Sequence, residues 1–310
     1  MAWICGFGAA LPSRLVSNAE ISALIGKTPE WIQSVSGIQH RRWVASGETL
    51  LELAVRAAED CLSKTAVSAS EIGLILVASA SAPRRFPGPA AVVAAQLGLQ
   101  EIPAIDLPIA SAGALFGMAL ANELAPRFGP TLVVASEVLS PFVVAEPIEA
   151  GVAMLFGDGA GACLIHPTSG LFKICQVQLA SDGSFAEDLR LEFQGPIQMN
   201  GRAVILQASR KIPRAIQQVL DRQAIPASQV DRFLLHQANQ NLLDRVADVL
   251  TLPREKFFSN IAHYGNTSSA SVLIAAAESF QQQPPPSGAY VCFAAFGAGF
   301  HWGAMLCQAG

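Results

Sequence analysis

An apolar run stops at a single histidine in residues 231–239, which have the sequence DRFLLHQAN. Phe233, Leu234 and Leu235 predict a buried strand, and the polar residues after them predict a loop. A strand that stops at His236 presents the imidazole at its carboxyl-terminal edge, where the binding sites of α/β proteins form. The alternative is a loop histidine bonded to the backbone, and periodicity alone does not separate the two.

Similar apolar runs recur along the chain. They predict strands over residues 73–78, 131–135, 161–165, 231–236 and 289–294. Helical periodicity predicts helices over residues 49–62, 112–124, 203–222, 241–250 and 268–280. In each half of the chain, one helix and strand are followed by a second helix and strand. We therefore expect a layered α/β fold of two pseudo-repeated halves, residues 1–167 and 168–310, with the active site where they meet.

The composition narrows the functional class. The 310 residues are 51% apolar and 14% charged, with a formal charge of −4, so a large core is expected and disorder is not. No run of like charge points to nucleic acid or to a membrane surface. The first residues lack a secretory pattern, and no stretch of 18 residues is uninterruptedly apolar, so a cytoplasmic protein is expected.

The cysteines and the glycine runs indicate no bound metal or cofactor. None of the six cysteines forms a C-x-x-C pair, and buried reduced thiols are expected. The runs at 156–161 and 296–300 lack the lysine of a phosphate-binding loop and do not open a helix as a dinucleotide fingerprint does. A nicotinamide-dependent oxidoreductase is therefore excluded. These runs indicate close backbone approach or amides exposed to an oxyanion.

Two further residues are candidates for chemistry. Ser111 stands at the start of the helix predicted from residue 112, where the helix dipole favours a developing anion. Asn266 follows Gly265 just before the helix predicted from residue 268 and offers a neutral donor. The alternative for both residues is an ordinary helix cap, because serine and asparagine are common at that position.

Six short motifs follow one another along the chain. They are SAG at 111–113, FGDGAG at 156–161, DGS at 182–184, HQAN at 236–239, GNTSSAS at 265–271 and FGAGF at 296–300. Together they resemble the ketoacyl-acyl-carrier-protein synthase III family, and the likeness extends from Gly6 to Gly303. The resemblance implies a thiolase-like fold with α-β-α-β-α layers, a homodimer, an acyl carrier protein as partner, and acyl-CoA or acyl-phosphopantetheine as substrate rather than cofactor.

The resemblance also implies roles for individual residues. Ser111 stands where the family has its nucleophilic cysteine, while His236 and Asn266 match the pair that donates hydrogen bonds to a malonyl thioester and stabilises the enolate left by decarboxylation. The oxyanion contacts match the amide of Ser111 and the loop containing Gly297 and Gly299. The residues implied to bind substrate are Trp31, on the coenzyme A base, Phe86, across the dimer in the acyl pocket, Phe296 and Asn239.

Serine at position 111 departs from the family pattern. A thiol becomes a thiolate readily, whereas an alcohol needs a base during attack, and His236 is the only matched candidate. Condensation should therefore be slow, while acyl transfer to another acceptor, or hydrolysis, can persist. The serine is either natural to an acyltransferase variant or an engineered Cys→Ser change, and the sequence leaves both open.

Basic residues are also missing where the family binds coenzyme A. Val35, the pair Gln240 and Asn241, and the segment 141–143 stand at those places, which favours a carrier-bound acyl donor. The basic residues available for a carrier surface are Arg210, Lys211, Arg214, Arg245, Arg254 and Lys256. These losses also leave open a second class of function, a catalytically silent thiolase-fold subunit that partners an active paralogue.

Overall fold

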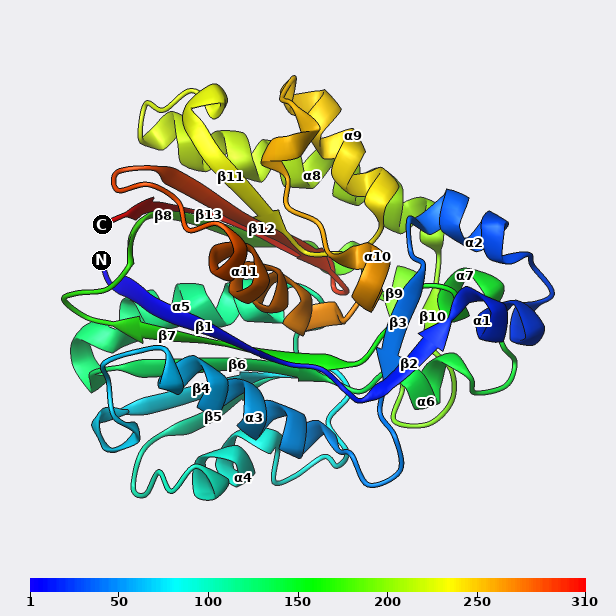
Figure 1. Ribbon diagram of the computed structural model, residues 1–310, viewed down its shortest axis with the longest axis horizontal. Helices are drawn as coiled ribbons and strands as arrows, with labels where there is room; N and C mark the ends of the chain where they lie inside the picture. The colour runs from blue at the N-terminus through cyan, green and yellow to red at the C-terminus, as the bar shows by residue number, and fades with distance from the viewer.

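A mixed sheet of nine strands organises the chain in the computed structural model, which covers residues 1–310 (Figure 1). In spatial order the strands are β11 (Val230–Leu235), β12 (Tyr290–Gly297), β13 (His301–Ala309), β8 (Phe172–Ser181), β1 (Trp3–Ala10), β7 (Gly159–His166), β6 (Thr131–Glu137), β4 (Leu74–Ala78) and β5 (Ala104–Leu107). Only Trp3 and Ile4 of β1 pair with β8, whereas β1 pairs along its length with β7. The two parts of the sheet therefore diverge from this junction.

Helices fill three layers around the two parts of the sheet. Between the parts lie α5 (Gly113–Phe128) and α11 (Ser271–Gln282), which share a core with both inner faces. The outer face of the β7–β5 part is covered by α3 (Leu50–Ser63) and α4 (Pro89–Gln96). The outer face of the β11–β8 part is covered by α8 (Gly201–Arg222) and α9 (Gln240–Leu250). This arrangement confirms the expected α-β-α-β-α layers.

Shorter elements form a cap at the end of the layers where α1 and α2 lie in Figure 1. They are β2 (Arg14–Ser17), α1 (Asn18–Ile25), α2 (Pro29–Ser36), β3 (His40–Trp43), α6 (Ser140–Val143), α7 (Ala150–Ala153), β9 (Leu189–Arg190), β10 (Gln198–Met199) and α10 (Ile261–Tyr264). The boundary expected between residues 167 and 168 falls in the connection from β7 to β8, and the division into two halves there stays a prediction.

All five strands expected from apolar runs are present, but three long strands, β1, β8 and β13, and the short edge strand β5 were not expected. Strand β1 contains Gly6 and Gly8, which are poor strand formers. A Cβ on Gly8 would lie 2.3 Å from the carbonyl oxygen of Ala57, so the glycine is required by the close approach of α3. Strand β8 carries Gln176 and Gln178 among its apolar residues and is only half-buried over most of its length, so it lacks a continuous apolar run.

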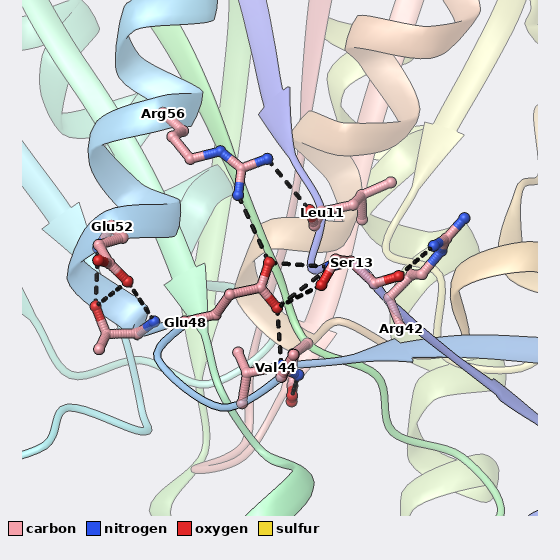
Figure 2. A network of polar contacts seen from close by, with 10 residues as sticks. Leu11, Ser13, Arg42, Val44, Glu48, Glu52 and Arg56 are labelled. Atoms are coloured by element: carbon pink, nitrogen blue, oxygen red, sulfur yellow. Dashed lines mark hydrogen bonds and ion pairs between the residues drawn. The ribbon is translucent and has the colours of Figure 1, made fainter.

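A carboxylate fixes the turn after β1 to the start of α3 (Figure 2). Glu48 accepts hydrogen bonds from the amides of Ala45 (2.8 Å) and Ser13 (3.0 Å), and it lies 3.9 Å from the guanidinium of Arg56. The hydrogen bond from Ala45 and those from Ser13 lower the pKa of the Glu48 carboxyl. Arg56 also donates to the carbonyl oxygen of Leu11. The exposed entrance to α3 is thereby held in one conformation.

The expected burial of the thiols holds at four of the six cysteines, because Cys5 and Cys175 are only half-buried. All six cysteines are free, and Cys61, Cys163, Cys292 and Cys307 are buried in the cores. Among the helices, none combines the length and the apolar character that crossing a bilayer requires.

Candidate active site

Ser111 lies in the tight connection between β5 and α5. Its φ is +60°, in the left-handed region that costs a residue with a side chain about 1–2 kcal/mol. Helix α5 begins at Gly113 with Ala112 as its N-cap and without a side-chain capping hydrogen bond. Ser111 is therefore not a helix cap, and that alternative is wrong. Its hydroxyl stands just before the positive end of a 16-residue helix.

Gly297 brings the end of β12 against the backbone that carries Ser111. A Cβ on Gly297 would lie 2.0 Å from the carbonyl oxygen of Ala110 and 2.9 Å from the Cβ of Ser111. Only glycine permits this contact. Gly299 has a φ of +129° and lies against the imidazole of His301 instead.

His236 is the first residue after β11, as the sequence predicts. Its amide donates to the carbonyl oxygen of Ala294 (2.8 Å), and its Nδ1 lies 2.6 Å from Oγ of Ser271. That hydroxyl also accepts from the amide of Gln237 (3.1 Å), so the ring is held at one edge. Burial lowers the pKa of His236 to about 4, so the imidazole is neutral at pH 7.

Asn266 presents its amide group beside the histidine loop. Its Oδ1 accepts from the amide of Ser268 (2.9 Å), which leaves Nδ2 free to donate. The N-cap of the following 3₁₀ turn is Thr267, so the cap alternative for Asn266 is wrong as well. The backbone of Asn266 is held on both sides, because its amide donates to Leu155 and its carbonyl accepts from Gly157.

The FGDGAG run serves close packing rather than an oxyanion. A Cβ on Gly157 would lie 2.2 Å from the carbonyl oxygen of Tyr264, so glycine is needed where this run touches the Asn266 segment. Asp158 is fully buried, and its carboxylate accepts four hydrogen bonds, from the amides of Val44, Leu139 and Ser140 and from the Ser140 hydroxyl. Of the two possibilities left by the sequence, close approach is confirmed.

A buried glutamate and a serine that the sequence did not single out lie beside Ser111. Glu137 ends β6, and its carboxylate accepts from Ser81 and Ser269 at 2.6 Å each. Burial raises the pKa of this carboxyl, and these hydrogen bonds oppose the rise. The neighbouring Ser268, at a φ of +48°, accepts from the amide of Ser111 (3.0 Å) and lies 3.5 Å from its hydroxyl. The amide expected to bind an oxyanion is therefore occupied in this state.

Two cavities meet at Ser111. The smaller, of about 80 Å³, also has His236 and Asn266 in its wall, with Asn239, Phe296 and Gly297 around them. The larger, of about 570 Å³, extends past Ala298, Gly299 and His301. The site residues predicted from the sequence therefore line these two cavities, with two exceptions. Trp31, on α2, and Phe86, which is 83% exposed, line neither cavity in the single chain.

Comparison with known proteins identifies the family. The family model described as 3-oxoacyl-[acyl-carrier-protein (ACP)] synthase III matches residues 105–183, and the model of its C-terminal region matches residues 220–309. The beta-ketoacyl-[acyl-carrier-protein] synthase III of Thermosynechococcus vestitus is 36% identical over 97% of this chain and 96% of its own. The chain belongs to the synthase III family. Members of this family are acyltransferases.

Solved structures of synthase III agree over the whole chain. The crystal structure of the enzyme from Aquifex aeolicus superposes with a TM-score of 0.95 at 31% identity, covering 99% of this chain and 100% of the other. The structure from Pseudomonas aeruginosa gives a TM-score of 0.91 at 31% identity, covering 99% of this chain and 98% of the other. The thiolase-like fold expected from the sequence is therefore confirmed.

The synthase III residues expected to contact substrate near α9 are partly engaged within the chain. Nδ2 of Asn239 donates to the carbonyl oxygen of Val35 (2.9 Å), and its Oδ1 accepts from the amide of Asn241 (2.8 Å). The side chain of Asn241 donates to the same carbonyl (3.1 Å). These contacts join the start of α9 to the end of α2. Uncharged asparagines therefore stand where basic residues were expected.

The expected basic surface is smaller than the sequence suggests. Lys211 pairs with Asp182 (3.3 Å) and lies over the ring of Trp302. Arg254 pairs with two aspartates of α9, and Lys256 donates to two backbone carbonyl groups. The residues that are exposed and form no ion pair are Arg210, Arg214 and Arg245.

Proposed function

We propose that this synthase III family member forms an acyl-serine at Ser111 and transfers the acyl group to the enolate of a malonyl thioester or to another acceptor. The meeting of two cavities at a serine beside His236 and Asn266 carries the proposal. A site with one cavity for the acyl chain and another for the thioester arm suits a covalent acyl-transfer mechanism.

In the acylation step, Oγ of Ser111 attacks the thioester carbonyl carbon. The new C–O bond replaces the C–S bond, and the hydroxyl proton passes to Nε2 of His236 and then to the departing thiolate. The neutral imidazole suits this role, because it has a lone pair to accept the proton. For the carbonyl oxygen to use the Ser111 amide, the Ser268 hydroxyl must move aside, and the dipole of α5 favours the anion.

In the second step the same pair acts on the malonyl thioester. For this step the ring takes the other tautomer, with the Ser271 hydroxyl donating to Nδ1, so that Nε2–H of His236 and Nδ2 of Asn266 donate to the carbonyl oxygen as carbon dioxide leaves. The resulting enolate carbon attacks the acyl-serine. The C–O bond to Ser111 then breaks, and the serine alkoxide takes up a proton from solvent, because the hydroxyl proton left with the thiol in the first step. An oxoester is less activated than a thioester toward carbon, so this step is the slower one.

We further propose that the acyl donor is a carrier protein rather than free coenzyme A. The uncharged asparagines at the start of α9 offer no cation to a nucleotide phosphate. By contrast, three basic residues remain exposed for dispersed contacts with a carrier: Arg210, Arg214 and Arg245. Each missing phosphate contact should weaken coenzyme A binding by about 1.5–3 kcal/mol. A competition assay with matched acyl-carrier and acyl-CoA donors at two salt concentrations tests this. A preference for acyl-CoA contradicts it, as does a carrier preference that survives Glu at all three arginines.

A homodimer is proposed on separate grounds. Phe86 is 83% exposed, and it adjoins Arg84 and Arg85 of the rim of the larger cavity, where Arg85 lies over the ring of the exposed Phe193. Large apolar side chains grouped at a cavity rim suit burial against a second subunit. Light scattering should give a dimer mass that Phe86→Asp lowers, and a monomeric wild type at micromolar concentration refutes the dimer.

Intact-mass measurement after incubation with acyl-carrier and acyl-CoA donors tests the central proposal. One acyl adduct should form on the wild type, none on Ser111→Ala, and none on His236→Ala, which lacks the base. In a Ser111→Cys background, His236→Ala should spare much of the acylation, because the helix dipole favours the thiolate. Equal losses in both backgrounds would show that His236 is not the base. The absence of any adduct on the wild type favours the silent-partner alternative.

A further inference from the structure

His301 occupies a position close to the nucleophile that acyl transfer, as described above, does not use. It begins β13 and pairs directly with Gly297 of β12. Directly opposed residues of antiparallel strands have Cα atoms about 4.5–5.5 Å apart. Gly297 packs on the backbone of Ser111, so Gly297 lies between His301 and Ser111. His301 and Ser111 both line the larger cavity.

The imidazole of His301 is held with one nitrogen available. Nδ1 lies 2.7 Å from Oγ of Ser181, and the ring of Phe116 packs edge-on with a centroid distance of 5.5 Å. Gly299 supplies the space beside Nε2, since a Cβ there would lie 2.5 Å from that atom. Nε2 has no hydrogen-bond partner in the chain. Burial lowers the pKa of His301, which keeps the ring neutral near pH 7 and able to donate or accept at Nε2.

The wall of the larger cavity carries polar groups among its hydrophobic ones. Ser268, which lies 3.5 Å from the hydroxyl of Ser111, and His301 are two of them. A saturated acyl chain that displaced water from Nε2 would leave this nitrogen without a partner, which costs free energy. A hydroxyl group can accept from or donate to Nε2, so it suits either tautomer of the ring.

We propose that the larger cavity selects 3-hydroxyacyl groups, whose hydroxyl forms a hydrogen bond with Nε2 of His301. The inference rests on the proposed acylation of Ser111 and names the class of acyl group that this site takes. No covalent step is added: His301 binds the substituent and leaves the reacting carbonyl to Ser111 and His236.

The experiment compares acylation by octanoyl and 3-hydroxyoctanoyl groups on the same carrier protein, with initial rates followed by intact mass. The wild type should favour the hydroxylated donor by about tenfold, equivalent to about 1.4 kcal/mol. His301→Leu should reduce this ratio to near one, whereas His301→Gln, which keeps a hydrogen-bonding amide, should retain most of it. His263→Leu, an exposed histidine outside both cavities, should leave the ratio unchanged.

The possible failures are distinct. Equal rates for the two donors on the wild type, or a preference that persists in His301→Leu, overturn the selection of 3-hydroxyacyl groups and leave acyl-serine formation standing. The absence of an adduct with both donors overturns acyl-serine formation itself and, with it, this inference.

Discussion

Replacement of His236 should change how stability depends on pH, because this imidazole is buried in a neutral state. Its side chain is 6% exposed, and burial lowers its pKa to about 4, against about 6.5 in an unfolded chain. Between these values the unfolded chain binds a proton that the folded chain does not. The stability associated with the neutral ring is therefore fully present above about pH 6.5 and is lost as the pH falls toward 4.

The difference between the folded and unfolded pKa of His236 determines how much unfolding free energy is lost at low pH. A difference of about 2.5 units corresponds to about 3 kcal/mol over the whole range, and about 2 kcal/mol of this is lost between pH 7 and pH 5. Other groups also titrate there, but they are common to the wild type and a single variant. The comparison between the two therefore isolates His236.

Urea unfolding at pH 7 and pH 5 measures the effect. On going to pH 5, His236→Gln should lose about 2 kcal/mol less unfolding free energy than the wild type. Asn266→Ala changes the same pocket without removing a titratable group, so it should keep the full loss. Equal pH dependence in the wild type and in His236→Gln would refute a buried neutral imidazole. The acylation rate of the wild type should likewise show no inflection near pH 6.5.

Three further changes test the neighbouring contacts. Ser111→Cys should raise decarboxylative condensation with malonyl-carrier protein at least about tenfold, about 1.4 kcal/mol of barrier, and a variant inert with every chain length contradicts this. Gly297→Ala should lower the unfolding free energy by about 1–3 kcal/mol, because the Cβ meets backbone, while Gly183→Ala, with open space around it, should not. Ser271→Ala should lower kcat about 5–30-fold with little change in KM, since a loosened His236 ring loses about 1–2 kcal/mol, and a change in KM alone would count against this role.

Much of the layered fold could be predicted from apolar periodicity, because its central strands are buried on both faces. The strands expected at 131–135 and 161–165 lie within β6 and β7, and every residue of these two ranges is buried. The same rule missed β1 and β8. Glycines occur in β1 because α3 packs closely against it, which is a tertiary contact. Strand β8 is half-buried and carries glutamines. The contact of β1 with α3 cannot be read from the strand's own sequence, and the glutamines of β8 interrupt its apolar run.

In the candidate site, too, some residues could be predicted from the sequence and others could not. The motif order predicted that Ser111, His236 and Asn266 belong to one site, and all three line the smaller cavity. The supporting Glu137 was not predicted, because the expected strand stopped at Ala135 and a lone glutamate gives no sign that it will be buried. Likewise, the basic residues of α8 and α9 look alike in sequence, and only the positions of their partners show which of them are engaged.

The contacts around Glu137 explain how the strained conformations of Ser111 and Ser268 persist without a substrate. Left-handed conformations at these two residues cost about 1–3 kcal/mol each, so the surroundings must hold them. Hydrogen bonds from Ser81 and Ser269 tie the ends of β4 and β6 to the turn that carries Ser268. A carboxylate buried this deeply needs such donors, and releasing the turn would remove the one that Ser269 supplies, while Ala80 and Ser81 would still donate. The strained turn beside Ser111 and the hydrogen bonding of the carboxylate are therefore coupled. The free energy that positions Ser111 therefore comes from the folded chain, whereas its amide becomes available to an oxyanion only when the Ser268 hydroxyl moves aside.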